Sequence, residues 1–371
     1  MDVQPPLTVR VCGGLCCALA GAGELAKQLP AMLGGAAEVE AASCMGRCDQ
    51  APVLMIGEVA LPRASPESLL NLLLHGDAAA ALPRAENDAS ADSVGYEAYR
   101  AGGGYTLAAS VVNGEQDPAV VLQAIEDSGL RGWGAGDDAA GLWRHMSGLP
   151  APRTLAVNID EEPGSFKDRH FLERDPHRFL EGLLVAAQLT GSEMAAIHFR
   201  PEHEDCRLML EAELGQLWAH PPCPLPRIAV REGEGHAPVI NAYETLHWVR
   251  DIVEKGAGWF NRFGRNGCRG LRSYSIGGRV NSPGVKVAPA GITLNELIEE
   301  YCDGMCEGHQ LYAWLPAGTW GSILPARLAT VPLDHHTLEP FGCSLGPAAV
   351  VVLSWHDRAR CDAFRVMATT L

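Results

Sequence analysis

The chain has 371 residues, which is too long for one ordinary domain, so two or three domains are expected. Hydrophobic residues make up 47% of the chain and charged residues 20%, which is enough apolar material to bury ordinary cores. The formal net charge of −16 argues against nucleic acid and against an anionic membrane surface as partners.

The sequence predicts neither a signal peptide nor a transmembrane segment. The N-terminus, MDVQPPLTVRV, lacks the charged segment and the long apolar core of a signal peptide. The longest apolar runs, such as PAAVVVLSW at 347–355, are much shorter than a membrane-spanning helix requires. We therefore expect a cytoplasmic protein, in which the twelve cysteines are thiols or metal ligands rather than disulfides.

The first 76 residues predict a small α/β domain. Apolar patterning indicates three strands, at 7–12, 37–42 and 52–57. Helical patterns occur at 22–33 and 65–76. The order strand, helix, strand, strand, helix is typical of a thioredoxin-like domain, and it leaves loops after the strands where side chains can converge.

Four cysteines in this domain have the spacing of a metal site. Cys12 and Cys17 stand in VCGGLCC, and Cys44 and Cys48 stand in SCMGRCDQAP. Two such pairs can hold a [2Fe–2S] cluster, with two thiolates on each iron. A Zn(Cys)4 site and buried structural thiols are the alternatives, although zinc ribbons favour Cys-x2-Cys pairs, which this region lacks. Cys16 is adjacent to Cys17 and competes with it as a ligand.

The middle of the chain predicts a second α/β domain. Residues 77–94 are rich in Ala, Asp and Ser without a period and are expected to form a linker. Beyond them, helices are expected at 118–128 and 175–190, and strands at 154–158 and 194–199.

Two segments of this second domain contain candidate binding residues. GLRGWGAGDDAAGLWRHM at 129–146 is rich in glycine, which lets backbone amides approach a phosphate closely. NIDEEPGSFKDR at 158–169 offers amide, carboxylate and cationic groups that suit the hydroxyls of a ribityl chain or ribose. Alone, each segment is also compatible with a surface loop or a solvated turn with local ion pairs.

The last hundred residues predict a third, smaller module. Two short strands joined by a turn at 282–284 precede a helix that starts at Thr293, which favours a compact β-grasp-like domain. A buried-looking strand, AAVVVLS at 348–354, precedes the start of a further helix.

The motifs together resemble two subunits of respiratory complex I. The two cysteine segments are similar to its thioredoxin-like [2Fe–2S] subunit. Residues 129–169, with INAYETLHWVRDIVEKGAGWF at 240–260 and VPLDHHTLEPFGCSLGPAAVVVLS at 331–354, are similar to its FMN- and NADH-binding flavoprotein subunit. The fused order resembles the β (diaphorase) subunit of NAD-dependent formate dehydrogenases and NAD-reducing hydrogenases.

This resemblance implies an α/β fold class with a thioredoxin-like domain, a central flavoprotein-like domain and a small β-grasp (SLBB-like) domain. The implied division is 1–76 for the [2Fe–2S] domain, 77–94 for the linker, 95–265 for the FMN/NADH-binding-like domain, 266–340 for the β-grasp domain, and 341–371 for the start of a helical region. The implied function is that of a subunit that passes electrons between NAD(H), FMN and iron–sulfur centres. Its partners would be other subunits of a multi-subunit redox complex.

The resemblance also assigns individual residues. The flavin-phosphate loop corresponds to Gly132, Gly134 and Gly141. The flavin-contacting strand end corresponds to Asn158, Asp160 and Glu161, followed by Glu162 toward the nicotinamide nucleotide. Asn241 matches the first residue of the family's Asn-Asn-Val-Glu-Thr segment. The cluster ligands remain Cys12, Cys17, Cys44 and Cys48.

Several residues depart from the family pattern and leave the function open. Asp138 stands where the family has an aromatic residue, Trp143 where it has a lysine, and Ala242 where it has a second asparagine. The Cys-x2-Cys-x2-Cys motif of the family's [4Fe–4S] cluster is absent from the 371 residues. Besides the active subunit, we therefore consider a degenerate paralogue that acts as a structural or [2Fe–2S] relay subunit without FMN, and a fragment of a longer subunit.

Overall fold

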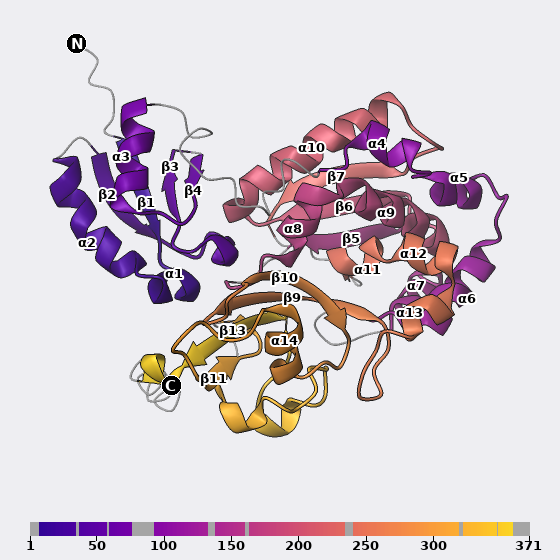
Figure 1. The fold of residues 1–371 in the computed structure, drawn as a ribbon. Coiled ribbons are helices and arrows are strands. Elements are labelled where there is room, and N and C mark those ends of the chain that lie inside the picture. Colours follow the sequence, from indigo (N-terminus) through magenta and orange to yellow (C-terminus); the bar gives the residue numbers. More distant parts are fainter. Residues whose placement is uncertain are drawn as a thin grey trace, which may run out of the picture.

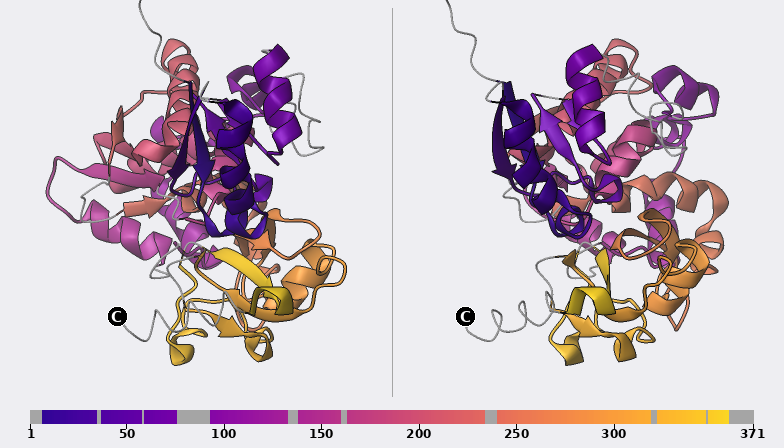
Figure 2. Two further views of the ribbon diagram at one scale, coloured as in Figure 1. Left: turned by 90° about the vertical axis from the view of Figure 1, so that its left-hand side faces the viewer. Right: turned by 60° about the vertical axis from the view of Figure 1, so that its left-hand side comes forward.

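Three separate β-sheets organise the chain, and Figures 1 and 2 show them as three neighbouring bodies joined by their loops. The structure is a computed structural model. It describes residues 7–34, 37–57, 59–75, 93–132, 138–159, 163–233, 240–318, 322–346 and 348–358. The expected fold class is confirmed: a thioredoxin-like domain, a flavoprotein-like α/β domain and a β-grasp sheet follow one another along the chain.

The N-terminal sheet has the strand order β2-β1-β3-β4. The first pair is parallel and the other two pairs are antiparallel. Its strands are β1 (Leu7–Cys12), β2 (Ala37–Ala42), β3 (Leu54–Ile56) and β4 (Val59–Leu61). Its helices are α1 (Leu15–Leu19), α2 (Ala22–Leu33) and α3 (Pro66–His75). Leu29 of α2 and Leu69 of α3 are fully buried with Val9 of β1, so both longer helices pack onto this sheet.

The central sheet is parallel throughout and has the order β7-β6-β5-β8. Its strands are β5 (Thr154–Ile159), β6 (Met194–Phe199), β7 (Arg227–Glu232) and β8 (Ile240–Ala242). Parallel neighbours need long crossover connections. Those between β5, β6 and β7 contain α8 (Lys167–Arg174), α9 (Pro176–Thr190) and α10 (Glu204–Ala219). The Asp175 side chain caps α9 by accepting from the Arg178 N–H, and Pro176 occupies the first turn, as the sequence predicts.

Further helices in the described ranges surround this sheet. They are α4 (Tyr96–Ala101), α5 (Thr106–Val112), α6 (Pro118–Ser128), α7 (Ala139–Ser147), α11 (Tyr243–His247), α12 (Val249–Lys255) and α13 (Ala257–Asn261). Their buried faces join α9 in the largest apolar core of the protein. Among the residues that the structure describes, none of the helices has both the length and the apolar character needed to cross a bilayer.

The strand order of the central sheet changes direction at β5. The chain moves from β5 to β6 and β7 on one side, and it returns to place β8 on the other side of β5. Val157 lies opposite Asn241, and Asn158 lies opposite Ala242. In open parallel sheets, ligands bind outside the carboxyl ends of the strands at such a reversal. The sheet therefore places the end of β5 beside Asn241, at the edge where ligands bind in open parallel sheets.

The third sheet has the order β10-β9-β13-β11-β12. Its strands are β9 (Leu271–Gly278), β10 (Gly284–Pro289), β11 (Leu311–Leu315), β12 (Leu324–Pro325) and β13 (Ala349–Ser354). Helix α14 (Leu294–Tyr301) packs on it, and Thr293 caps this helix as expected. Strand β13 lies in the middle, parallel to β9 and antiparallel to β11. The domain boundaries themselves stay a prediction.

Helices α9 and α11 approach each other too closely for any side chain at Gly182. A methyl group there would lie 1.9 Å from the carbonyl oxygen of Leu246. We expect Gly182→Ala to lower the free energy of unfolding by about 1–3 kcal/mol, because one of the two helices must shift. Urea denaturation measures this loss. Gly215→Ala is the control, because a methyl group on that face of α10 meets nothing within 4 Å, and it is expected to stabilise by about 0.5–1 kcal/mol. Equal stabilities of the two variants would contradict the close packing.

Candidate functional site

The four predicted ligands come together at one end of the N-terminal sheet. Cys12 is the last residue of β1 and Cys17 lies on α1, while Cys44 and Cys48 flank the turn after β2. The sulfurs of Cys44 and Cys48 are 3.8 Å apart. Two thiolates bound at about 2.3 Å to one tetrahedral ion lie roughly 3.8 Å from each other, so this pair already has the separation that a metal requires.

Contacts between the thiols link the two pairs. The thiols of Cys12 and Cys48 lower the pKa of Cys44 because they interact with its sulfur. The backbone N–H groups of Gly46 and Gly164 lower the pKa of Cys44 as well. The thiol of Cys12 also lowers the pKa of Cys17. The neighbouring thiols and burial raise the pKa of Cys12 and of Cys48. Metal binding requires the thiolate form of each of these cysteines.

Cys16 and Cys17 point in different directions and are not equivalent. Successive residues on an α-helix are separated by about 100° around its axis. Cys17 interacts with Cys12 and is buried in the core of the thioredoxin-like domain. Cys16 instead interacts with Cys48 and is buried where the domains meet. The pairing Cys12 with Cys17 is therefore the one that the geometry favours.

The space between the pairs is kept open by a glycine. A methyl group at Gly14 would lie 3.0 Å from the Cys44 sulfur and 3.5 Å from the Cys12 sulfur. In the described ranges, no group of three or more His, Cys, Asp or Glu side chains is arranged around one metal ion. A [2Fe–2S] cluster instead needs two thiolates on each of two irons, and two pairs beside an open space fit that requirement.

The thiols lie at a junction of all three domains. A separate apolar cluster, which we call the junction core, includes residues of the thioredoxin-like domain, of the segment after β5 and of the β-grasp sheet. Its fully or almost fully buried members are Cys16, Leu19, Cys48, Phe166, Ala313, Leu315, Val351 and Leu353. This shared core covers the cysteines on the side that faces the other two domains.

A buried arginine holds the loop of the second cysteine pair. Arg169 of α8 donates from Nε to the Gly46 carbonyl at 3.1 Å, and its Nη2 lies 3.3 Å from Asp49. A second ion pair, Arg47 to Asp205 of α10 at 2.7 Å, joins the same loop to the flavoprotein-like domain. The sequence motif FKDR gave no indication of this role, because the partners are more than a hundred residues away.

The flavin-side residues are only partly described. Gly134, Asp160, Glu161 and Glu162 lie outside the described residues. Gly132 lies at the start of the glycine segment, and Asn158 lies at the carboxyl end of β5, beside β8. These positions agree with a site at the reversal of strand order.

Two groups expected at a flavin are engaged by the protein itself. The Trp143 indole is fully buried and donates to Asn241 Oδ1 at 2.8 Å, and Asn241 Nδ2 donates to the Ala156 carbonyl at 3.2 Å. The Gly141 N–H is taken by the Asp138 carboxylate, which caps α7 at 2.8 Å. Both Trp143 and Asp138 are departures from the family pattern. In the described part of this site, Asn241 and the Gly141 N–H therefore already have hydrogen-bond partners within the protein.

Another buried polar group joins the central domain to the β-grasp sheet. Lys167 forms ion pairs with Asp168 and Glu244. Glu244 accepts from the backbone N–H of Ser273 at 2.8 Å and from its hydroxyl at 2.9 Å. The lysine of the acidic segment thus has a structural role, which differs from the expected binding of hydroxyl groups.

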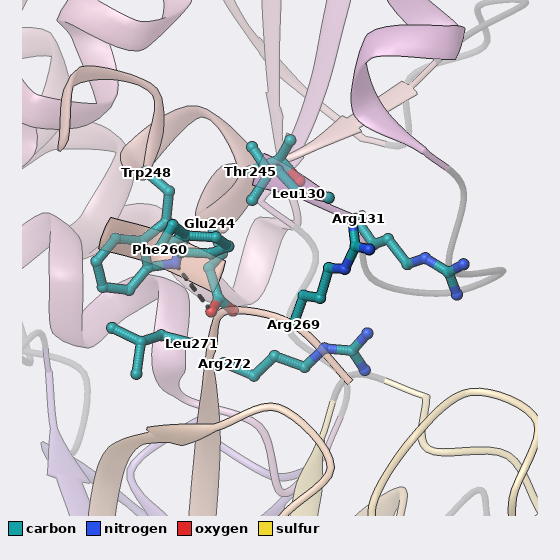
Figure 3. A pocket seen from close by; sticks show the side chains of 10 residues that line it. Leu130, Arg131, Glu244, Thr245, Trp248, Phe260, Arg269, Leu271 and Arg272 are labelled. Atoms are coloured by element: carbon teal, nitrogen blue, oxygen red, sulfur yellow. Dashed lines mark hydrogen bonds between the residues drawn. The ribbon is translucent and has the colours of Figure 1, made fainter. Parts of the chain in front are cut away.

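A cleft lies beside the start of the glycine segment, and Figure 3 shows its side chains. Its cavity volume is about 10 Å³, room for little more than one water molecule, and it opens to solvent. Three arginines, Arg131, Arg269 and Arg272, lie along one side, while the rings of Trp248 and Phe260 lie on the other. Guanidinium groups bind phosphate and carboxylate well, so the cleft favours an anionic ligand.

Two families match the chain. Residues 3–75 match the thioredoxin-like [2Fe-2S] ferredoxin family, and residues 125–249 match the Nuo51 FMN-binding domain. In Rhizobium meliloti, the second F-type chain of NADH-quinone oxidoreductase is 32% identical over 302 residues, which cover 69% of this chain and 71% of the relative. The F-type chain of the Mycobacterium bovis NADH-quinone oxidoreductase is 31% identical, over 66% of this chain and 65% of its own length.

The fold also matches a solved structure. The chain superposes on a chain of an NAD+-reducing [NiFe]-hydrogenase in the H2-reduced state with a TM-score of 0.73, at 22% sequence identity. The match covers 94% of this chain and 69% of the other. At this identity, the likeness establishes the shared fold.

Cys44 interacts with both Cys12 and Cys48, so substitution of Cys44 is a direct test of the proposed cluster site. We expect Cys44→Ser to remove the cluster, so that iron and sulfide fall from about two each per chain toward zero, together with the EPR signal of the reduced protein. Cys343→Ser, a buried cysteine of the β-grasp core, is the control and should keep its iron. A Cys44→Ser protein with full iron content would refute the ligand assignment.

The hydrogen bond between Trp143 and Asn241 has a measurable consequence. Trp143→Phe keeps a ring but leaves the buried Asn241 oxygen without its donor, so the free energy of unfolding should fall by about 1–3 kcal/mol. Trp218→Phe is the control, because Trp218 is half exposed on α10. Chemical denaturation compares the two, and equal losses would show that the indole N–H contributes nothing.

Proposed function

Because the chain belongs to the family of NADH-quinone oxidoreductase F-type chains, we propose that it carries electrons between NAD(H), FMN and a [2Fe–2S] cluster inside a multi-subunit redox complex. The main support for this proposal is that the four thiols lie close together at the junction of the three domains. The relatives named above are parts of NADH-quinone oxidoreductase, and the fold is that of a hydrogenase that reduces NAD+.

Each cysteine pair would serve one iron. Cys12 and Cys17 would bind the first iron, and Cys44 and Cys48 the second. When bound, the cluster supplies a one-electron carrier whose potential depends on burial and on hydrogen bonds to its sulfurs. The protein's part is to keep water away through the junction core and to stabilise the Cys44 thiolate through the nearby N–H groups of Gly46 and Gly164, which lower its pKa.

The cluster site and the flavin side are consecutive in the chain. Gly164, whose backbone lowers the pKa of Cys44, lies only six residues after Asn158, and Arg169, which binds the Gly46 carbonyl, follows on α8. Six residues span at most about 20 Å. The segment that would contact flavin is therefore covalently close to the segment that touches the cluster, which supports electron exchange between them.

The flavin and nucleotide residues remain proposals. We propose Gly132, Gly134, Gly141, Asn158, Asp160, Glu161 and Asn241 for FMN, and Glu162 toward NAD(H). The cleft with Arg131, Arg269 and Arg272 offers a surface for the phosphates of an anionic nucleotide. We propose the domain division 1–76, 95–265 and 266–340, with a linker at 77–94. Strand β13, which follows residue 340, completes the third sheet and therefore belongs with the last of these domains.

A second candidate function is a relay subunit that works without FMN. It is favoured by one observation: Trp143 and Asp138 occupy the polar groups of Asn241 and Gly141. Such a subunit would keep the cluster and pass electrons between neighbouring subunits.

We propose that the protein works in the cytoplasm with other subunits of its complex as partners. All cysteines in the described ranges carry free thiols, which suits a reducing compartment. The match spans about two thirds of the length of these relatives.

One preparation tests both candidates. Protein purified without oxygen is analysed for iron, sulfide, acid-released flavin and NADH-dependent dye reduction. We expect about two irons and two sulfides per chain for either candidate. Stoichiometric FMN with NADH activity supports the first, and a loaded cluster without flavin supports the second. A protein that binds no iron after anaerobic reconstitution would refute both.

A further inference from the structure

We propose that Arg169 is a positioning residue whose buried positive charge, held against the loop of the second cysteine pair, raises the reduction potential of the [2Fe–2S] cluster. The inference rests on the proposed cluster site and adds to it a residue from another domain. Arg169 Nε donates to the Gly46 carbonyl at 3.1 Å, and Gly46 lies midway between Cys44 and Cys48 in the sequence. Because the Cα atoms of residues two apart are separated by at most about 7 Å, the guanidinium lies beside the segment that carries both ligands of one iron.

The conformation of this loop leaves the contact little freedom to change. Gly46 has a φ of +63°, which lies in the left-handed region that favours glycine. A methyl group at Gly46 would lie 3.1 Å from Cε1 of His203, which is itself buried. The Gly46 carbonyl therefore keeps its direction toward α8, the helix that carries Arg169.

The charge of Arg169 is shielded from water more completely than the charges of its carboxylate partners. Its guanidinium lies 3.3 Å from Asp49 and 3.0 Å from Glu173. The Arg169 side chain is 4% exposed, whereas those of Asp49 and Glu173 are 27% and 25% exposed. Water and salt screen the partly exposed carboxylates more strongly than the buried cation, so a net positive field remains toward the cysteines.

The effect on the cluster has a definite sign. Reduction adds one electron, and with it one negative charge, to the cluster. A positive charge nearby stabilises the reduced state, and a negative charge nearby destabilises it. The potentials of iron–sulfur clusters depend on net charge in this way. Removing the charge of Arg169 should therefore lower the potential, and removing the charge of Asp49 should raise it.

The test is a redox titration of the full chain, followed by EPR, on protein purified or reconstituted without oxygen. We expect Arg169→Gln to lower the reduced-to-oxidised ratio at a fixed ambient potential about tenfold, which is a midpoint about 59 mV more negative for a one-electron couple. Arg169→Lys keeps the charge and should show less than half of that shift. Asp49→Asn should move the midpoint in the positive direction.

Arg265→Gln is the matched control, because Arg265 also pairs with two carboxylates. Its partners, Glu296 and Glu300 of α14, lie 3.2 Å and 2.7 Å away, but all three side chains are at least 31% exposed. Water screens such a group, so its removal should leave the midpoint unchanged.

A merely structural role for Arg169 would alter the iron content or the stability of the protein without moving the midpoint of the loaded cluster. An unchanged or more positive midpoint in loaded Arg169→Gln protein overturns the inference, as does an equal shift in Arg169→Lys. If Arg169→Gln holds no cluster, Asp49→Asn decides, and an unchanged or more negative midpoint there overturns it. Failure of the proposed function is seen separately, as wild-type protein that binds no iron.

Discussion

The arrangement of the domains depends on the buried Arg169 side chain, which binds the loop that carries the second cysteine pair. Its guanidinium is almost completely buried and has an acceptor in each direction: the Gly46 carbonyl, Asp49 and Glu173. A buried charge with only some of its partners would be costly, so the loop and α8 are held together as one unit. Because the same loop carries Cys44 and Cys48, Arg169 and the Arg47–Asp205 ion pair together fix the cluster site to the flavoprotein-like domain.

The cysteine end and the flavin end of the expected electron path differ in the size of the residues that line them. At the cysteine end, small residues keep space open: Gly14 between the pairs and Gly277 against Cys16. At the flavin end, larger or charged residues fill space and take up donors, as Trp143 does with Asn241 and Asp138 with the Gly141 N–H. The relay end is therefore better preserved than the end that would exchange hydride. This contrast is why iron and flavin content must be measured separately.

The sequence predicted local structure well where capping and patterning are local. Helices 118–128 and 175–190, and the strand at 194–199, agree with α6, α9 and β6 to within a residue, because Asp117, Asp175 and their prolines mark the helix starts. The cysteine spacing likewise predicted which thiols converge. The spacing could not show whether Cys16 or Cys17 is the ligand, because the answer depends on the rotation of α1 against β9. The sequence also did not indicate that Lys167 pairs with Glu244 or that Arg169 binds the Gly46 carbonyl, because these partners are distant in sequence.

The central position of β13 in the third sheet has a consequence for the order of assembly. Val351 and Leu353 of this strand form part of the junction core over the cysteines, yet they are made about 300 residues after Cys48. At the usual rate of synthesis of about 5–20 residues per second, that interval lasts roughly 15–60 s. During this time the thioredoxin-like domain can fold while the wall that β13 supplies does not exist. The junction core over the thiols is thus incomplete until β13 has been synthesised.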